Sequence, residues 1–168
     1  MVAVGATGGV GSYFVQLAAR RGARPVAVCR GENADYARRL GAADVIDYTT
    51  GGIAEAVRSR YPGGIDAIAD IHGDREGLAR LAEQVRPGGS VASAVGAADA
   101  EELGGRGIEA TNVLGLVTKE SLEALLSMLE AGKIAAPAIR PFSLADAVDA
   151  LAALATGHVR GKISVTVV

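Results

Sequence analysis

The chain has few of the residues on which several classes of protein depend. Its 168 residues include one cysteine, two histidines, no tryptophan, four tyrosines and two phenylalanines. A single cysteine excludes a disulfide within the chain and is typical of a reducing compartment, so we expect a cytoplasmic protein. A metal site built only from cysteine and histidine needs about four ligands, and the chain has too few of both for that.

Long apolar runs and an excess of one charge are also missing. No stretch approaches the roughly 20 apolar residues of a membrane-spanning helix, and no charged-then-apolar leader precedes the first apolar segment. The net charge is −2, with both signs interspersed, which gives no reason to expect a nucleic-acid partner. With 49% hydrophobic residues and a mean hydropathy of +0.27, the composition excludes a disordered chain.

Short apolar segments alternate with stretches of helical spacing along the whole chain, and glycine or proline separates most of them. This alternation predicts an α/β protein with a doubly wound parallel sheet, helices covering both of its faces in three layers. We expect a loop over residues 96–107, and Ser143 as the N-cap of the last helix. Strands are predicted at 1–4, 25–29, 45–46, 65–71, 90–95, 108–114 and 162–168, and helices at 11–21, 34–40, 53–60, 78–85, 121–129 and 144–155.

A glycine-rich turn, GATGGVG, lies between the first predicted strand and the first predicted helix. A diphosphate must approach the backbone closely, which Gly8 permits, while the N–H groups and positive dipole of a helix N-terminus face the anion. Gly11 lets the helix pack tightly on the strand. The first glycine of the G-x-G-x-x-G pattern is replaced by Ala6. The alternative is a turn that merely tolerates glycine, but the flanking strand and helix favour a dinucleotide site.

The residue that follows the second predicted strand distinguishes the two nicotinamide dinucleotides. A carboxylate there holds the ribose 2′-hydroxyl of NAD, whereas this chain has Arg30. A guanidinium attracts a 2′-phosphate, so we predict NADP(H) as the cofactor. Two alternatives stay open: Arg30 is also explained as a solvated surface arginine, and a rotated loop would bring Glu32 to the ribose instead. Asn33 offers a neutral hydrogen bond in either case.

The order of several motifs resembles the medium-chain dehydrogenase/reductase superfamily, and within it the zinc-independent quinone oxidoreductase and enoyl reductase branch. The resemblance is carried by VGATGGVGSYFVQLAARRGA, RLGAADVIDYT, GGIDAIADIHG, VRPGGSVASAVG and the closing RPFSLADAVDALAALATGHVRGKISVTV. It implies that residues 1–168 form a Rossmann-type NAD(P)-binding domain, with the family's C-terminal segment at about 141–168. Members of the family are about twice this length. The N-terminal substrate domain is therefore expected to be absent, either because this is an isolated cofactor domain, which we favour, or because the partner is a separate chain.

The resemblance also implies an activity. The intact enzyme is expected to transfer hydride from NADPH to a small-molecule acceptor, namely a quinone, an enone or a related carbonyl compound, and to be a homodimer. Two alternatives stay open: a non-catalytic module that senses NADP(H), and the cofactor domain of a synthase enoyl reductase. No residue is assigned as catalytic, because two distant histidines and no G-x-S-x-G motif give no nucleophilic constellation. None of the four tyrosines has a lysine four residues later, which argues against a short-chain reductase.

Cofactor contacts carry over from the resemblance residue by residue. The turn residues Gly8, Gly9 and Val10 match the diphosphate site, together with their neighbours Ala6 and Thr7. Arg30 and Asn33 match the loop that meets the 2′-phosphate. The other matches are Tyr48 near the adenosine, Ile71 and His72 beside the ribose and nicotinamide, Val95, Gly96, Leu114 and Gly115 at strand ends bordering the nicotinamide, and Lys162 near the phosphates.

Four further polar residues have both a functional and a structural interpretation. His72 could bind a ribose or move a proton, but a histidine that only lines the cleft is the more frequent case. Asp70 is equally compatible with a structural role at a strand end and with the cofactor rim. Cys29 is expected to be a small buried residue without chemistry, and His158 a solvated loop residue.

Overall fold

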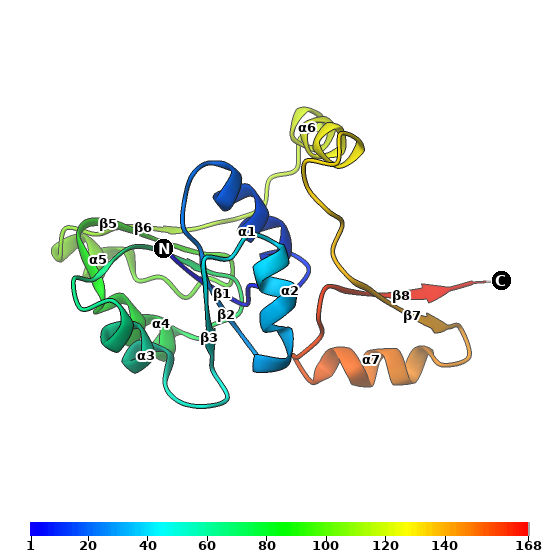
Figure 1. Ribbon diagram of the computed structural model, residues 1–168, viewed down its shortest axis with the longest axis horizontal. Helices are drawn as coiled ribbons and strands as arrows, with labels where there is room; N and C mark the ends of the chain where they lie inside the picture. Colours follow the sequence, from blue (N-terminus) through cyan, green and yellow to red (C-terminus); the bar gives the residue numbers. More distant parts are fainter. Residues whose placement is uncertain (168) are drawn as a thin grey trace.

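A computed structural model describes residues 1–167 and confirms the predicted α/β class (Figure 1). Six parallel strands form one sheet in the order β3-β2-β1-β4-β5-β6. Helices α1 and α2 lie on one face of the sheet and α3, α4 and α5 on the other. The strands are β1 (Val2–Val4), β2 (Val26–Cys29), β3 (Asp44–Asp47), β4 (Ile65–Asp70), β5 (Val85–Ser93) and β6 (Glu109–Asn112). The helices are α1 (Gly11–Arg20), α2 (Ala34–Arg39), α3 (Ile53–Arg60), α4 (Arg75–Ala82), α5 (Ala100–Gly105), α6 (Lys119–Glu130) and α7 (Ala147–Ala155).

Side chains that alternate along each strand divide the core into two layers. Because successive residues of a strand point to opposite faces, Val2 packs in the layer under α3 and α4, while Ala3 packs in the layer under α1 and α2. The first layer contains large residues such as Ile46 and Ile68. Half of the buried residues in the layer under α1 and α2 are alanines, and small side chains there let α1 approach the sheet closely. That approach places the N-terminus of α1 directly above the end of β1.

The structure corrects two boundaries in the second half of the sheet. The predicted loop at 96–107 contains α5, whose N-cap Asp99 accepts a hydrogen bond from the backbone N–H of Glu102 at 3.1 Å. The predicted helix at 78–85 starts earlier, because the Asp74 side chain caps it at 2.7 Å, and it ends at Ala82. Val85 instead begins β5 by pairing with Ile65, and regular pairing resumes only at Ser90, past the Pro-Gly-Gly segment.

The C-terminal part also differs from the prediction. The missed strand β7 (Ile139–Ser143) pairs with β8 (Lys162–Thr166) in a separate two-stranded sheet, so the last predicted strand does not extend the main sheet. Residue 168 of that prediction lies outside the described residues. Ser143 is not the N-cap of α7; its hydroxyl donates to the Asp146 carboxylate at 2.6 Å, and α7 begins after Asp146.

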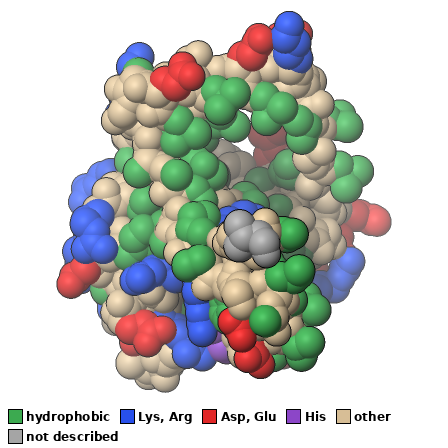
Figure 2. Space-filling view, turned by 90° about the vertical axis from the view of Figure 1, so that its right-hand side faces the viewer, with side chains coloured by type: hydrophobic (Ala, Val, Ile, Leu, Met, Phe, Trp, Pro, Cys, Tyr) green, Lys and Arg blue, Asp and Glu red, His purple; other side chains and the backbone are tan. Residues whose placement is uncertain are grey.

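The β7–α7–β8 unit and α6 stand apart from the main sheet and carry exposed apolar side chains. Figure 2 shows these side chains gathered on one face, around a hollow between α6 above and the β7–α7–β8 unit below. Helix α6 contributes no buried residue. The connection from α6 to β7 is nevertheless held on α1, because the Gln16 side chain exchanges two hydrogen bonds with the backbone of Ala135, at 2.7 and 3.0 Å.

Candidate functional site

The glycine turn brings the end of β1 to the N-terminus of α1. Gly5 has φ +78°, and a Cβ there would lie 2.8 Å from the Cβ of His72, so both the backbone conformation and the space require glycine. The N–H of Gly8 donates to the carbonyl of Gly5 at 3.2 Å, which closes the turn. No side chain caps α1, and its first turn has no acidic residue. The positive end of this helix is therefore open to an anion.

The C-terminal segment lies across this turn. The backbone N–H of Gly161 donates to the carbonyl of Thr7 at 2.8 Å, and Gly161 forms a β-bridge with Gly8. The side chain of Lys162 covers Gly9 so closely that a Cβ at Gly9 would lie 2.6 Å from the Lys162 ammonium nitrogen. A lysine charge therefore lies next to the exposed backbone of the turn, although these residues are more than 150 positions apart.

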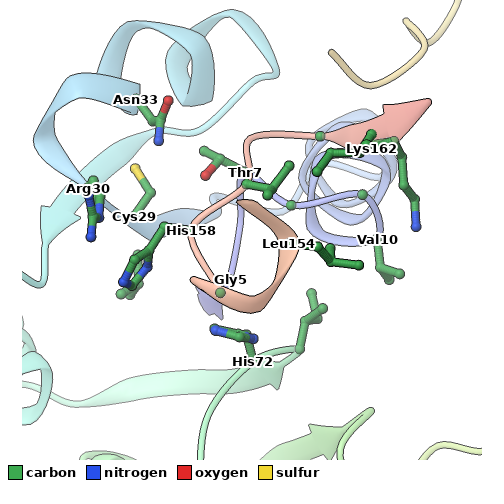
Figure 3. Close-up of a pocket in the computed structure, with 18 of the residues that line it drawn as sticks. Gly5, Thr7, Val10, Cys29, Arg30, Asn33, His72, Leu154, His158 and Lys162 are labelled. Carbon is green, nitrogen blue, oxygen red and sulfur yellow. The ribbon is translucent and has the colours of Figure 1, made fainter. Parts of the chain in front are cut away.

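A cavity of about 490 Å³ opens above the turn (Figure 3). Ten of the residues predicted for cofactor binding line it: Thr7, Gly8, Gly9, Val10, Arg30, Asn33, Tyr48, Ile71, His72 and Lys162. Figure 3 shows Arg30 and Lys162 on opposite sides of the cavity, with Thr7 of the turn between them. The structure thus brings together residues from the ends of β1, β2, β3 and β4 and from the C-terminal segment.

The structure does not bring five of the predicted residues to this cavity. Ala6 is fully buried, and its side chain packs in the core layer under α1. Val95 and Gly96, after β5, and Leu114 and Gly115, after β6, lie at the same carboxyl edge of the parallel sheet but are exposed and line none of its cavities. Their contact with a nicotinamide stays a prediction.

Three side chains form a hydrogen-bonded row at the end of β2. The Nε of Arg30 donates to the hydroxyl of Tyr48 at 3.2 Å. The same hydroxyl lies 3.2 Å from Nδ1 of His158, and the two rings stack with centroids 6.4 Å apart. His158 is exposed, as expected, but it is held by Tyr48 instead of being free in solvent. The C-terminal loop thereby reaches the position predicted for the 2′-phosphate.

Two acidic side chains lie near this row. Asp47, at the end of β3, accepts hydrogen bonds from the hydroxyl and the N–H of Thr49 at 2.7 and 2.9 Å. These bonds, together with one from the Gly31 N–H and the charge of Arg30, hold the pKa of Asp47 below its usual range. Glu32 lines a separate cavity of about 600 Å³, beside β7. The position of Glu32 and the hydrogen bonds that occupy Asp47 leave Arg30 as the charged side chain that enters the first cavity on this side.

Asp70 has a structural role. It is 1% exposed, and its carboxylate accepts hydrogen bonds from the N–H of Gly73 and the hydroxyl of Ser93, both at 2.7 Å. The Ser93 oxygen in turn accepts from the N–H groups of Val95 and Ala97. This buried network fixes the loops after β4 and β5 relative to each other. His72 lies beside it and lines both the first cavity and a second one of about 640 Å³.

Cys29 lines the cavity but is 3% exposed. Burial, with a smaller contribution from the charge of Asp47, raises the pKa of its thiol to about 11. Because only the thiolate reacts with alkylating reagents, we expect iodoacetamide at pH 8 to modify the folded chain about 100-fold more slowly than the urea-unfolded chain. Mass spectrometry of timed samples measures both rates, and equal rates would contradict this assignment.

Sequence reasoning missed most of the C-terminal contribution to the cavity. Besides Lys162, the last turn of α7 and the segment after it supply residues that the sequence did not single out as cofactor contacts. These are Leu154, Gly157, His158, Val159, Gly161 and Ile163. The apolar periodicity of α7 and β8 predicts which residues form these two elements. It does not predict that the segment between them docks on the glycine turn. The two glycines that flank His158 were the only local signal of a close backbone approach.

Comparison with known proteins agrees with this architecture. The family model described as zinc-binding dehydrogenase matches residues 40–165. The mitochondrial NAD(P)H oxidoreductase RTN4IP1 of Mus musculus is 28% identical over 188 residues, covering 98% of this chain and 47% of that protein. The chloroplastic quinone-oxidoreductase QR1 of Triphysaria versicolor is 30% identical over 172 residues, covering 95% and 50%. The quinone oxidoreductase structure from Coxiella burnetii superposes with a TM-score of 0.86 at 26% identity, covering 99% and 52%.

The chain spans about half the length of the relatives that it matches. Their names place the first two in organelles, and the cytoplasmic location expected from the cysteine content stays a prediction. No helix within residues 1–167 combines the length and the apolar character that a membrane crossing requires.

The family's description names zinc, but the described part of the chain has no matching set of ligand side chains. Residues 1–167 contain no group of three or more His, Cys, Asp or Glu side chains placed to hold a metal ion. The match over residues 40–165, the six-stranded fold and the oxidoreductase relatives lead to one conclusion. The chain belongs to the zinc-binding dehydrogenase family of medium-chain dehydrogenases and reductases.

Proposed function

We propose that this chain is the NADP(H)-binding part of an oxidoreductase that transfers hydride from NADPH to a quinone, an enone or a related carbonyl acceptor. The observation that carries the proposal is the row of anion-binding elements along one edge of the sheet. The uncapped N-terminus of α1 lies beside Lys162, and Arg30 lines the same cavity on its other side. Two separated sites for negative charge suit a cofactor with a diphosphate and a distant 2′-phosphate.

The turn fits a diphosphate on its own geometry. Gly8 and Gly9 expose backbone at the start of a helix, and the Lys162 ammonium lies against Gly9. Free N–H groups and a lysine charge together bind phosphate oxygens more strongly than either does alone, because each such hydrogen bond is charge-assisted. In this role Gly8, Gly9 and Val10 orient the diphosphate and Lys162 neutralises part of its charge.

The proposed cofactor supplies the hydride, and the residues of this chain bind and orient it. The strand ends at Ile71, Val95 and Leu114 follow the sheet edge away from Arg30, which makes them the proposed border of the nicotinamide. We assign no residue as a general acid or base. His72 lies at the same edge and is proposed as a wall of the cofactor groove.

An apolar face next to the groove supports a second half for the enzyme. Leu114 and Leu116 are 86% and 88% exposed, and Val148 and Leu151 on α7 are 77% and 66% exposed. Exposed apolar side chains gathered on one face mostly mark an interface. We propose that a substrate domain covers this face (Figure 2) and completes the acceptor pocket, of which this chain supplies one wall.

Replacing Arg30 with alanine tests the choice of cofactor. We expect the wild-type chain to bind NADPH more tightly than NADH, and Arg30→Ala to weaken NADPH binding about tenfold, because a charge-assisted hydrogen bond to the 2′-phosphate is lost. NADH affinity stays within about twofold. Isothermal titration calorimetry with both cofactors measures the four dissociation constants.

Arg58→Ala is the matched control, because this substitution removes the same charge. Arg58 is exposed on α3 and lines none of the three cavities described above. It should change neither affinity. Equal binding of NADH and NADPH by the wild-type chain, or no effect of Arg30→Ala, would contradict the assignment of the 2′-phosphate.

A further inference from the structure

His158 occupies a point where three cavities meet. It lines the cavity above the glycine turn, the cavity of about 640 Å³ between α3 and α4, and the cavity of about 600 Å³ beside β7. The loop that carries it is anchored on the glycine turn by the hydrogen bond from Gly161 to Thr7. On the other side, a Cβ at Gly157 would lie 3.5 Å from Nε2 of His72, in van der Waals contact. These two contacts fix the position of the loop between the glycine turn and His72.

The hydrogen bonds of Tyr48 favour one protonation pattern of the His158 ring. Nε of Arg30 can only donate, so the Tyr48 oxygen accepts that hydrogen bond. We assign the single hydroxyl hydrogen of Tyr48 to its contact with Nδ1 of His158, 3.2 Å away, because the hydroxyl then both accepts and donates a hydrogen bond within the row. Nδ1 is thereby an acceptor, and a neutral imidazole in this arrangement carries its hydrogen on Nε2.

The Nε2–H of His158 has no hydrogen-bond acceptor among the described residues. The guanidinium of Arg30 has further N–H donors beyond the Nε that binds Tyr48. The two donors belong to side chains that are joined through one tyrosine and line the same cavity. Donors held at fixed positions around a cavity favour a ligand that has several acceptor oxygens, such as a phosphate monoester.

We propose that His158 is a specificity-determining residue for the cofactor: through Nε2–H it binds the phosphorylated ribose that Arg30 also contacts, with Tyr48 holding both side chains. This inference rests on the proposed NADP(H) function. It assigns to the C-terminal loop a direct share in cofactor choice, in addition to the residues that follow β2. It also explains why Tyr48, which follows β3, lies between a residue after β2 and a residue after α7.

Several charged side chains surround the row of Arg30, Tyr48 and His158. Asp47 lies near Arg30, and Glu32 lies on the β7 side of His158, so both acidic groups oppose a phosphate weakly. Arg160, two residues beyond His158, has its guanidinium over the ring of Tyr36, 5.4 Å from the centroid. Arg160 lines the cavity beside β7, but it belongs neither to the row of Arg30, Tyr48 and His158 nor to the cavity above the glycine turn, which makes it a suitable control.

Two conservative substitutions separate ligand binding from a purely structural role. In His158→Asn the amide oxygen replaces Nδ1 as the acceptor for Tyr48, but the Nε2 donor is lost. In His158→Gln an amide N–H replaces the Nε2 donor. We expect His158→Asn to reduce the preference for NADPH over NADH about fivefold with NADH affinity unchanged, as for one lost hydrogen bond, and His158→Gln to retain most of the preference.

Calorimetric titration of the wild-type chain, both variants and Arg160→Ala with NADPH and NADH gives the ratios, and urea denaturation verifies that each variant is folded. Arg160→Ala should keep the wild-type ratio. An unchanged ratio in His158→Asn, or equal weakening of both cofactors, overturns the proposal for His158. If those results accompany a wild-type preference for NADPH that Arg30→Ala removes, the proposed function still stands. A wild-type chain without preference overturns both.

Discussion

Replacing Gly8 with valine should lower the affinity for NADPH about 100-fold while leaving the fold intact. A Cβ at Gly8 would meet only the carbonyl oxygen of Gly5, at 3.5 Å, which is an ordinary van der Waals contact. The larger side chain would instead occupy the space in front of the α1 N-terminus, where the diphosphate is proposed to bind. At least two charge-assisted hydrogen bonds of about 1.5 kcal/mol each would be lost.

Calorimetric titration measures the affinity, and circular dichroism during urea denaturation measures the free energy of unfolding, which should fall by less than about 1 kcal/mol. Gly63→Val is the matched control. Gly63 is exposed before β4, at the opposite edge of the sheet, and a Cβ there meets nothing within 4 Å. A Gly8→Val chain that bound NADPH as tightly as the wild type would refute the diphosphate site.

Replacing Gly11 with alanine should instead act on the fold and lower the free energy of unfolding by about 3 kcal/mol. A Cβ at Gly11 would overlap the carbonyl oxygen of Gly5 and lie 2.8 Å from the Cα and the carbonyl carbon of Ala6. All of these atoms are backbone, so no side-chain rotation relieves the contact. The first turn of α1 must move away from β1, which loosens the alanine layer beneath the helix.

Urea denaturation of Gly11→Ala and of Gly104→Ala tests this prediction. Gly104 lies within α5, and a Cβ there meets nothing within 4 Å, so the same substitution should stabilise the chain by up to about 1 kcal/mol. Equal urea midpoints for Gly11→Ala and the wild type would show that the turn accommodates the Cβ without losing free energy of unfolding. Gly8 and Gly11 would then not have the separate roles described above.

The sheet and most of its helices were predictable because their signals are local. The first helix, the helix at 53–60 and the six strands of the main sheet follow from apolar spacing and from glycine and proline at the junctions. Helix α5 was missed because two glycines at 104 and 105 outweighed the N-cap signal of Asp99, and buried Leu103 holds it. Strand β7 was missed because Pro141 disfavours a strand in the absence of its partner β8.

The residues of the candidate site also divide into those that local sequence signals predict and those that they do not. The glycine turn, Arg30 and His72 were predictable, since the carboxyl ends of parallel strands lie at one edge of a sheet, whereas Tyr48 and Ile71 came only from the family resemblance. For His158 there was no such rule, because its position depends on how the β7–α7–β8 unit docks on the glycine turn.

By itself, the amino-acid sequence determined that this chain is a doubly wound α/β domain with a glycine-rich turn before its first helix and an arginine after its second strand. These are properties of short segments, and backbone sterics and apolar periodicity decide them. Only the tertiary structure decided that Lys162 covers Gly9 and that Tyr48 joins Arg30 to His158. Such contacts between distant segments depend on packing between elements, which no short stretch of sequence encodes.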